Sequence, residues 1–234
     1  MQKNSYLAPL CVGLLLIGCN PDKRPPATAS GAAAANSHSP QPGSGGVAGM
    51  HRAGPATAQQ AAMNRMMAAM DSLPAKGNAD YDFARMMHAH HQGAVEMADL
   101  ELRDDSDPAM RRLAATIKQA QQRELGELAS AIARLSAAPA TYQPQNSAEP
   151  FTRAMNASME GMMKTVSAPT AGPDLAFNQL MTSHHQSAVA MTQAELRYGT
   201  DQQLRDLARQ IIGTQQQEIK QLQQWQAQQA GITK

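Results

Sequence analysis

The segment FARMMHAHHQGAVEMADLEL, residues 83–102, returns later in the chain as FNQLMTSHHQSAVAMTQAEL, residues 177–196. The match runs without a gap from 83–128 over 177–222, at an offset of 94 residues and with 20 identities in 46 positions. A repeat of this length indicates a duplicated structural unit, so the fold is expected to contain one helical arrangement twice.

Each copy is predicted to form one short helix and two long ones. The expected ranges are 57–72, 79–103 and 107–136 in the first copy, and 148–166, 174–198 and 201–229 in the second. Apolar residues three and four apart give each last helix one buried face: Met110, Leu113, Ile117, Leu128, Ile132 and Leu135, then Leu204, Leu207, Ile211 and Leu222. Strand patterns are absent, so the expectation is an all-α four-helix bundle with pseudo-twofold symmetry, with the short helices over its ends or sides.

Several residues mark the expected helix ends. Pro173 suits the first turn of a helix, and Ser106-Asp107-Pro108 and Thr200-Asp201 supply N-caps at matching places in the two copies. Thr200 and Gln203 have the spacing of a capping box, and Gly199 fits the position just after a helix.

The chain begins with an apolar run, Leu7–Ile17, that is too short to span a membrane and is typical of a signal peptide. The run ends in Leu16-Ile17-Gly18-Cys19, which resembles the bacterial lipobox. That resemblance implies cleavage after residue 18 and a lipid on Cys19. The expected location is therefore the bacterial cell envelope, as a lipoprotein that faces the periplasm, with the outer membrane expected by analogy.

Four regions follow from this pattern: a signal peptide at 1–18, a flexible tether at 19–55, the first repeat at 56–140 and the second at 141–234. The tether is rich in Pro, Gly, Ala and Ser, a composition that buries too little apolar surface to order itself. Twenty basic and 19 acidic residues leave a net charge near zero, which gives no nucleic-acid footprint. The mature chain keeps only one cysteine, so no disulfide or thiolate site is expected.

The histidine pairs and their methionine neighbours are the candidate metal ligands, because residues three, four and seven apart share a helix face. The set is Met87, His90, His91 and Met97, with Met181, His184, His185 and Met191 in the second copy. Imidazole and thioether together form a soft donor set that suits Cu(I) and, by analogy, Ag(I). A di-iron oxidase is excluded, because no glutamate is followed by histidine three residues later. Histidines that merely satisfy a polar core are the alternative interpretation.

Other residues are weaker metal candidates or candidates for orienting a ligand: Met63, Met67, Met70, Met159, Met162, Glu101, Glu195, Glu124 and Glu218. The methionine rows at helical spacing are also typical of core filling, because methionine adapts to irregular gaps. Glu124 and Glu218, one turn after Gln121 and Gln215, could accept an imidazole N–H and orient the ring. An ion pair with a neighbour such as Arg111 is the alternative role for these two glutamates.

At the two histidine segments the chain resembles the bacterial domain of unknown function 305 family, whose members carry a Met-His-His-x-x-Ala-x-x-Met type of segment. A later helix follows the family pattern in Leu113-Ala114 to Ile117 and in Gln121 to Leu125, and both features recur in the second copy. The resemblance covers about residues 60–230. It implies a secreted, ferritin-like bundle, and some relatives are regarded as periplasmic copper-binding proteins. Many relatives read His-His-Glu, whereas Gln92 and Gln186 stand here and remove two carboxylates from the site.

The sequence therefore predicts a lipid-anchored envelope protein that binds or buffers copper as Cu(I), without catalytic turnover. Its expected partners are the metal ion and the membrane, through the lipid on Cys19, and the sequence is compatible with a homo-oligomer. The alternative function is a metal-free periplasmic interaction module or chaperone-like protein. No Ser-His-Asp order, nucleophile elbow or Gly-rich phosphate loop supports an enzyme.

Overall fold

The computed structural model describes residues 55–103, 107–166 and 172–232, which form six helices and no strand. The helices are α1 (Pro55–Asp71), α2 (Ala79–Arg103), α3 (Pro108–Leu135), α4 (Pro150–Val166), α5 (Pro173–Tyr198) and α6 (Gln202–Ile232). Every predicted helix is present, and the all-α prediction is confirmed. The predicted signal peptide, the lipid on Cys19 and the tether up to residue 54 lie outside the described residues.

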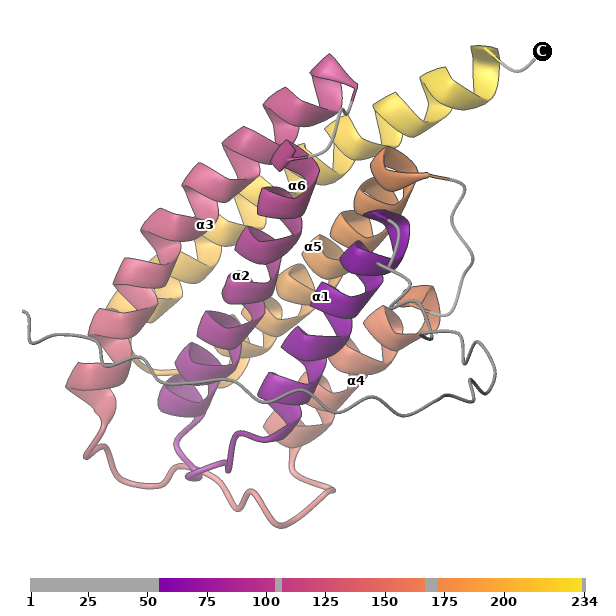
Figure 1. Ribbon diagram of the computed structural model, residues 1–234. Helices are drawn as coiled ribbons and strands as arrows, with labels where there is room; N and C mark the ends of the chain where they lie inside the picture. The colour runs from indigo at the N-terminus through magenta and orange to yellow at the C-terminus, as the bar shows by residue number, and fades with distance from the viewer. Residues whose placement is uncertain (1–54, 104–106, 167–171, 233–234) are drawn as a thin grey trace, which may run out of the picture. The chain divides into compact units, whose positions relative to one another are not determined.

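Helices α2, α3, α5 and α6 form the bundle, and all six helices belong to one compact unit, Met50–Lys234. Figure 1 shows α2 beside α3 and α5 beside α6, and α2 and α5 also pack against each other. Helix α1 packs on both α2 and α5, whereas α4 packs mainly on α5. The short helices therefore cover a side of the bundle, and the duplicated helices α2 and α5 meet at its centre.

The core repeats itself at the 94-residue offset. Phe83 and Phe177 are both fully buried, as are Met87 and Met181. The predicted stripe on α6 is wholly buried, whereas on α3 three of its six residues are buried and the rest only half-buried. Burying one such side chain contributes about 1.5–3 kcal/mol to folding, so apolar packing on these two faces holds the bundle together.

The long helices α3 and α6 each begin with an aspartate cap. The Asp107 carboxylate accepts the N–H groups of Ala109 and Met110 at 2.8 and 3.1 Å, and Asp201 accepts that of Leu204 at 2.9 Å. The predicted capping box between Thr200 and Gln203 is wrong. Because α6 starts at Gln202, the N-cap is Asp201, one residue after the threonine.

The two repeats brace each other at their connections through carboxylates. Asp80, at the start of α2, accepts the backbone N–H groups of Thr200 and Asp201 at 2.8 and 2.7 Å and the Thr200 hydroxyl at 3.1 Å. Asp174, at the start of α5, accepts the N–H of Asp107 at 3.1 Å. Asp80 and Asp174 are 94 residues apart, so each repeat uses the same position to hold the connection of the other.

Gly199 follows α5 directly, as predicted, but not in the left-handed conformation common at such positions, since its φ is −75°. Its lack of a side chain matters because of space. A Cβ at this position would lie 2.5 Å from Cδ of Glu195 and 2.7 Å from Oδ1 of Asp80. A glycine is therefore required where the Glu195 and Asp80 carboxyl groups crowd the end of α5.

Candidate functional site: a buried histidine core

Four histidines, His90 and His91 on α2 with His184 and His185 on α5, are fully buried and are called here the histidine core. The rings of His90 and His184 stack with their centroids 3.6 Å apart and an interplanar angle of 32°. The two histidine pairs, which the sequence could have placed in separate sites, therefore meet as one cluster. The cluster lies where the equivalent helices of the two repeats cross.

The second histidine of each pair points to the last helix of its own repeat. Nε2 of His91 lies 2.7 Å from Oε2 of Glu124, and Nε2 of His185 lies 2.8 Å from Oε2 of Glu218. The first contact is a hydrogen bond, whereas the second has the distance of an ion pair without hydrogen-bond geometry. Both glutamates therefore contact imidazoles, while Arg111 donates to the carbonyl of Leu102 at 2.7 Å.

The first histidine of each pair breaks the symmetry. Nε2 of His184 donates to the backbone carbonyl of His90 at 2.8 Å, and its Nδ1 lies 3.4 Å from Nδ1 of His185. Both ring nitrogens of His90, and Nδ1 of His91, are buried without a hydrogen-bond partner among the described residues. Buried polar atoms without partners cost about 1–3 kcal/mol each, so these nitrogens are the chemically unsatisfied part of the core.

The electrostatics of the core favour neutral rings at its centre. Burial, followed by the neighbouring His184 imidazole, holds the pKa of His90 well below its ordinary value. Burial and the adjacent His185 ring also lower the pKa of His184, although its bond to the His90 carbonyl acts in the opposite direction. A neutral imidazole carries one nitrogen lone pair of the kind that a metal ion needs, so one of the two unpartnered nitrogens of His90 could act as a ligand.

The four methionines that the sequence placed beside the histidines are all fully buried and belong to the same apolar cluster of the bundle: Met87, Met97, Met181 and Met191. The weaker candidates divide into two groups. Met63 and Met162 are fully buried, whereas Met67, Met70 and Met159 line a groove that contains none of the four histidines, and of these three only Met70 is buried.

The two glutamates that continue the histidine helices, Glu101 and Glu195, are fully buried. Glu195 lies at the end of α5 beside Asp80, and it therefore belongs to the brace between repeats. Its burial, followed by the repulsion of Asp80, raises the pKa of Glu195 to about 9. Burial and a neighbouring carboxylate both favour the protonated, neutral form of the Glu195 carboxyl group. The repeat carried a signal for this cluster, because Asp80 and Asp174 are 94 residues apart, just outside the aligned segments.

No group of three or more His, Cys, Asp or Glu side chains in the described ranges is arranged to hold a metal ion.

A family model described as Domain of unknown function (DUF305) matches residues 80–226, which include all four histidines and both aligned segments, 83–128 and 177–222. The chain belongs to this family. Among solved structures, the DUF305 chain resembles a DUF305 protein of Streptomyces coelicolor that is proposed to be secreted, with 28% identity and a TM-score of 0.50. That match covers 67% of this chain and 95% of the other. The DUF305 chain also resembles a DUF305 fragment from Deinococcus radiodurans, with 26% identity and a TM-score of 0.48. This match covers 66% of this chain and 99% of the fragment.

No curated protein matches the DUF305 chain. In the part of the chain that the structure describes, no helix is both long enough and apolar enough to cross a membrane.

Proposed function

We propose that this DUF305 protein binds and buffers a soft metal ion, Cu(I), at the histidine core. Imidazole nitrogens of His90 and His91 would serve as ligands together with thioether sulfur from the adjacent buried methionines, Met87, Met97, Met181 and Met191. Bound copper would supply no turnover, so the role is storage or sequestration and the protein is not an enzyme.

The observation that carries this proposal is the state of His90. Its two ring nitrogens are fully buried and make no hydrogen bond to the described residues, and burial keeps the ring neutral. A core that needed only to pack would be more stable with leucine there, because the unsatisfied nitrogens cost free energy. Retaining donors at a cost is expected where they bind a ligand.

The contacts around His91 and His185 support the same role. Metal-binding histidines usually offer one ring nitrogen to the metal and the other to a carboxylate, which fixes the orientation of the ring. His91 presents its Nε2 to Glu124 and leaves Nδ1 unpartnered, which is the arrangement such a ligand needs. His185 lies at a similar distance from Glu218, but without the geometry of a hydrogen bond, and its Nδ1 lies 3.4 Å from Nδ1 of His184.

We also propose that the protein works in the bacterial cell envelope, held at a membrane by a lipid on Cys19. The apolar run before Cys19 and its likeness to the lipobox support this location, and the related Streptomyces protein, proposed to be secreted, agrees with it. Metal ions from outside the cell reach the envelope before they reach the cytoplasm. A copper buffer in the envelope would therefore act on these ions first.

The test is an anaerobic Cu(I) titration of the wild-type chain and of His90→Leu in competition with a chromogenic Cu(I) chelator. His90→Leu removes two nitrogens that bond to no described residue, so the fold is expected to survive, as circular dichroism would check. We expect the variant to bind Cu(I) at least about tenfold more weakly, a loss of about 1.4 kcal/mol. His88→Ala, on the same helix but outside the core, is the control.

Equal Cu(I) affinity of the folded His90→Leu variant and the wild type would refute the histidine core as the site. If the wild type itself takes up no Cu(I), the metal-free interaction module becomes the better account. In that case the four buried imidazoles would serve only to fix the register between α2 and α5.

A further inference from the structure

A second feature lies between the two short helices. A groove of about 770 Å³ runs between α1 and α4, which each pack on the bundle but barely touch one another. Six methionines line it: Met67, Met70, Met86, Met155, Met159 and Met163. This feature, called here the methionine groove, contains none of the four core histidines.

The methionines of the described residues divide sharply by exposure. Four of them are not buried, and all four line the methionine groove: Met67, Met86, Met159 and Met163. The other methionines in the described ranges, including those beside the histidine core, are buried. The accessible thioethers are thus gathered at one place instead of being scattered over the surface.

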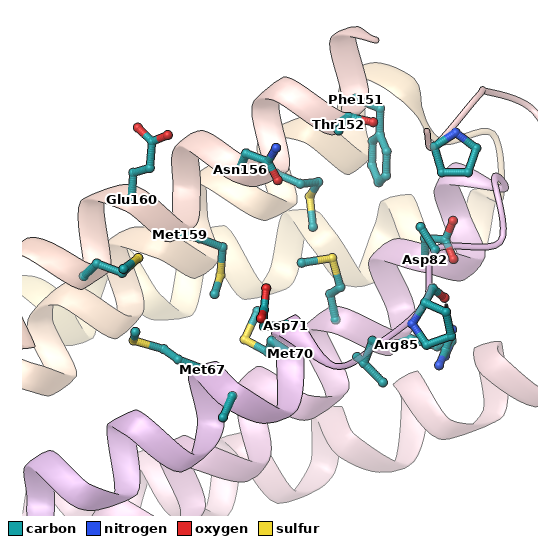
Figure 2. Close-up of a pocket in the computed structure, with 18 of the residues that line it drawn as sticks. Met67, Met70, Asp71, Asp82, Arg85, Phe151, Thr152, Asn156, Met159 and Glu160 are labelled. Atoms are coloured by element: carbon teal, nitrogen blue, oxygen red, sulfur yellow. Dashed lines mark hydrogen bonds between the residues drawn. The ribbon is translucent and has the colours of Figure 1, made fainter. Parts of the chain in front are cut away.

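The accessible sulfur atoms face the groove from both of its sides. Figure 2 shows Met67 on α1 and Met159 on α4, with their side chains extending into the space between the two helices. Met163, one turn beyond Met159, is 55% exposed, and no other large apolar side chain in the described residues is exposed. Oxidation of a thioether requires that the oxidant reach the sulfur lone pair, so susceptibility follows exposure. These sulfurs are therefore the first targets of an oxidant in solution.

The groove can also hold the oxidised side chains. A sulfoxide carries a polar oxygen that accepts hydrogen bonds, and burying this oxygen in an apolar core would be costly. Asn64 on α1 and Asn156 on α4 are exposed and line the groove, so their amide groups supply N–H donors on both of its sides. The open groove leaves room for the added oxygen, whereas a close-packed core does not. Oxidation in the groove should therefore leave the fold intact.

The charges along the groove favour a neutral oxidant. Asp71 and Glu160 are exposed and line it. Among the described residues of the lining, the one basic side chain, Arg85, donates to the carbonyl of Pro74 at 2.7 Å. The two exposed carboxylates would repel an anionic oxidant. Neutral hydroperoxides are therefore the class of oxidant that fits the groove.

We propose that the methionine groove is a site of reversible methionine oxidation, where the four accessible thioethers act as a sink for hydroperoxides. With hydrogen peroxide, the sulfur attacks one oxygen, the O–O bond breaks, and the proton of the transferred hydroxyl group passes to the departing hydroxide. The thioether is oxidised by two electrons to the sulfoxide, and the peroxide is reduced to water. A thiol-dependent sulfoxide reductase reverses the step, since two thiols become a disulfide and the oxygen leaves as water. This site does not depend on the histidine core.

The test uses hydrogen peroxide as the probe, with the chain labelled at the methionine methyl carbons. NMR follows each methyl resonance, which moves to the sulfoxide position when its sulfur is oxidised. We expect the four accessible methionines to react at least about tenfold faster than buried Met87 and Met181, because the oxidant reaches exposed sulfur first. The circular dichroism spectrum and the urea midpoint should be unchanged once these four have reacted. Equal rates in the groove and the core, or unfolding of the chain once the groove is oxidised, would overturn the proposal.

The variant arm replaces the four accessible residues by leucine, as Met67→Leu, Met86→Leu, Met159→Leu and Met163→Leu. Leucine keeps the apolar volume and removes the sulfur. With peroxide supplied in an amount equal to the four groove thioethers, the wild type should keep Met87 and Met181 reduced, whereas the variant should lose more of these two signals. The matched control, Met110→Leu with Met162→Leu, changes two buried methionines outside the groove and should behave as the wild type does.

Two results of these experiments would count against the sink. Equal oxidation of the core methionines in the wild type and in the folded leucine variant would show that the groove does not intercept the oxidant. Sulfoxide reductases for both sulfoxide epimers, with dithiothreitol, should restore the four methyl resonances, and failure to restore them would show that the oxidation is damage. If the leucine variant does not fold, the wild-type rates still decide the proposal.

Discussion

Replacing Glu195 by glutamine should make the protein more stable at neutral and alkaline pH. In the folded chain, burial and the Asp80 carboxylate raise the pKa of Glu195 to about 9, against an ordinary value of 4.5. Below pH 4.5 the folded and unfolded chains both hold this proton, and the folded state carries no penalty. As the pH rises from 4.5 towards 9, only the unfolded chain releases the proton, so the free energy of unfolding falls.

The size of the effect follows from the same two values. Each pH unit in this window lowers the free energy of unfolding by about 1.4 kcal/mol at most. At pH 7, which is 2.5 units above the ordinary value, the penalty has an upper limit of about 3 kcal/mol. A glutamine amide has nearly the shape of the protonated acid and cannot ionise. The Glu195→Gln variant should therefore keep the brace between the repeats and lose the penalty.

The assay is urea unfolding followed by circular dichroism at pH 5, 7 and 8.5. The wild type should lose stability across this series, and Glu195→Gln should lose much less, so the two curves diverge as the pH rises. Glu127→Gln, an exposed change on α3, controls for the loss of one negative charge. Parallel pH dependences of the wild type and Glu195→Gln would show that Glu195 does not hold the proton, and the reasoning would fail.

Two further substitutions test the packing and the caps. Gly93→Ala should destabilise the fold by about 1–3 kcal/mol, because the new Cβ would lie 2.5 Å from Cγ of Met66. Gly126→Ala should instead stabilise α3 by about 0.5–1 kcal/mol, because a Cβ there would meet no atom within 4 Å. The same urea assay measures both changes. Asp107→Ala should cost about 1 kcal/mol, because the cap of α3 and the contact with the Trp225 indole at 3.2 Å are both lost, and thermal unfolding would measure it. An unchanged melting temperature of Asp107→Ala would show that water replaces the cap.

The repeat predicted the fold almost completely. Apolar spacing along α3 and α6 located the bundle, since spacings of three and four are a property of the helix itself. The match between Phe83 and Phe177 likewise anticipated two equivalent core positions. These features are local or periodic, and sequence patterns report such features directly. The capping box at Thr200 failed because its hydroxyl is taken by Asp80, 120 residues away, and a local pattern cannot reveal such a partner.

The histidine core was anticipated in its residues but not in its arrangement. Helical spacing indicated which histidines and methionines share a helix face, yet only the packing of α2 against α5 brings His90 against His184. Glu195 was expected to bind a metal ion or to orient a ligand, but it lies beside Asp80 at the end of α5. Glu195 lies away from the histidines along α5, and its neighbour Asp80 belongs to the other repeat.

The reciprocal carboxylates Asp80 and Asp174 have a consequence for how such a chain could arise. Each carboxylate accepts a backbone hydrogen bond from the connection of the opposite repeat. A polypeptide with a single repeat would therefore leave this carboxylate, and the N–H groups of its own connection, without these hydrogen-bond partners. Two copies of that shorter polypeptide could make the same bonds across an isologous interface, where each contact occurs twice. The present molecule has the form of such a homodimer joined into one chain, with the equivalent residues His90 and His184 stacked between its two halves.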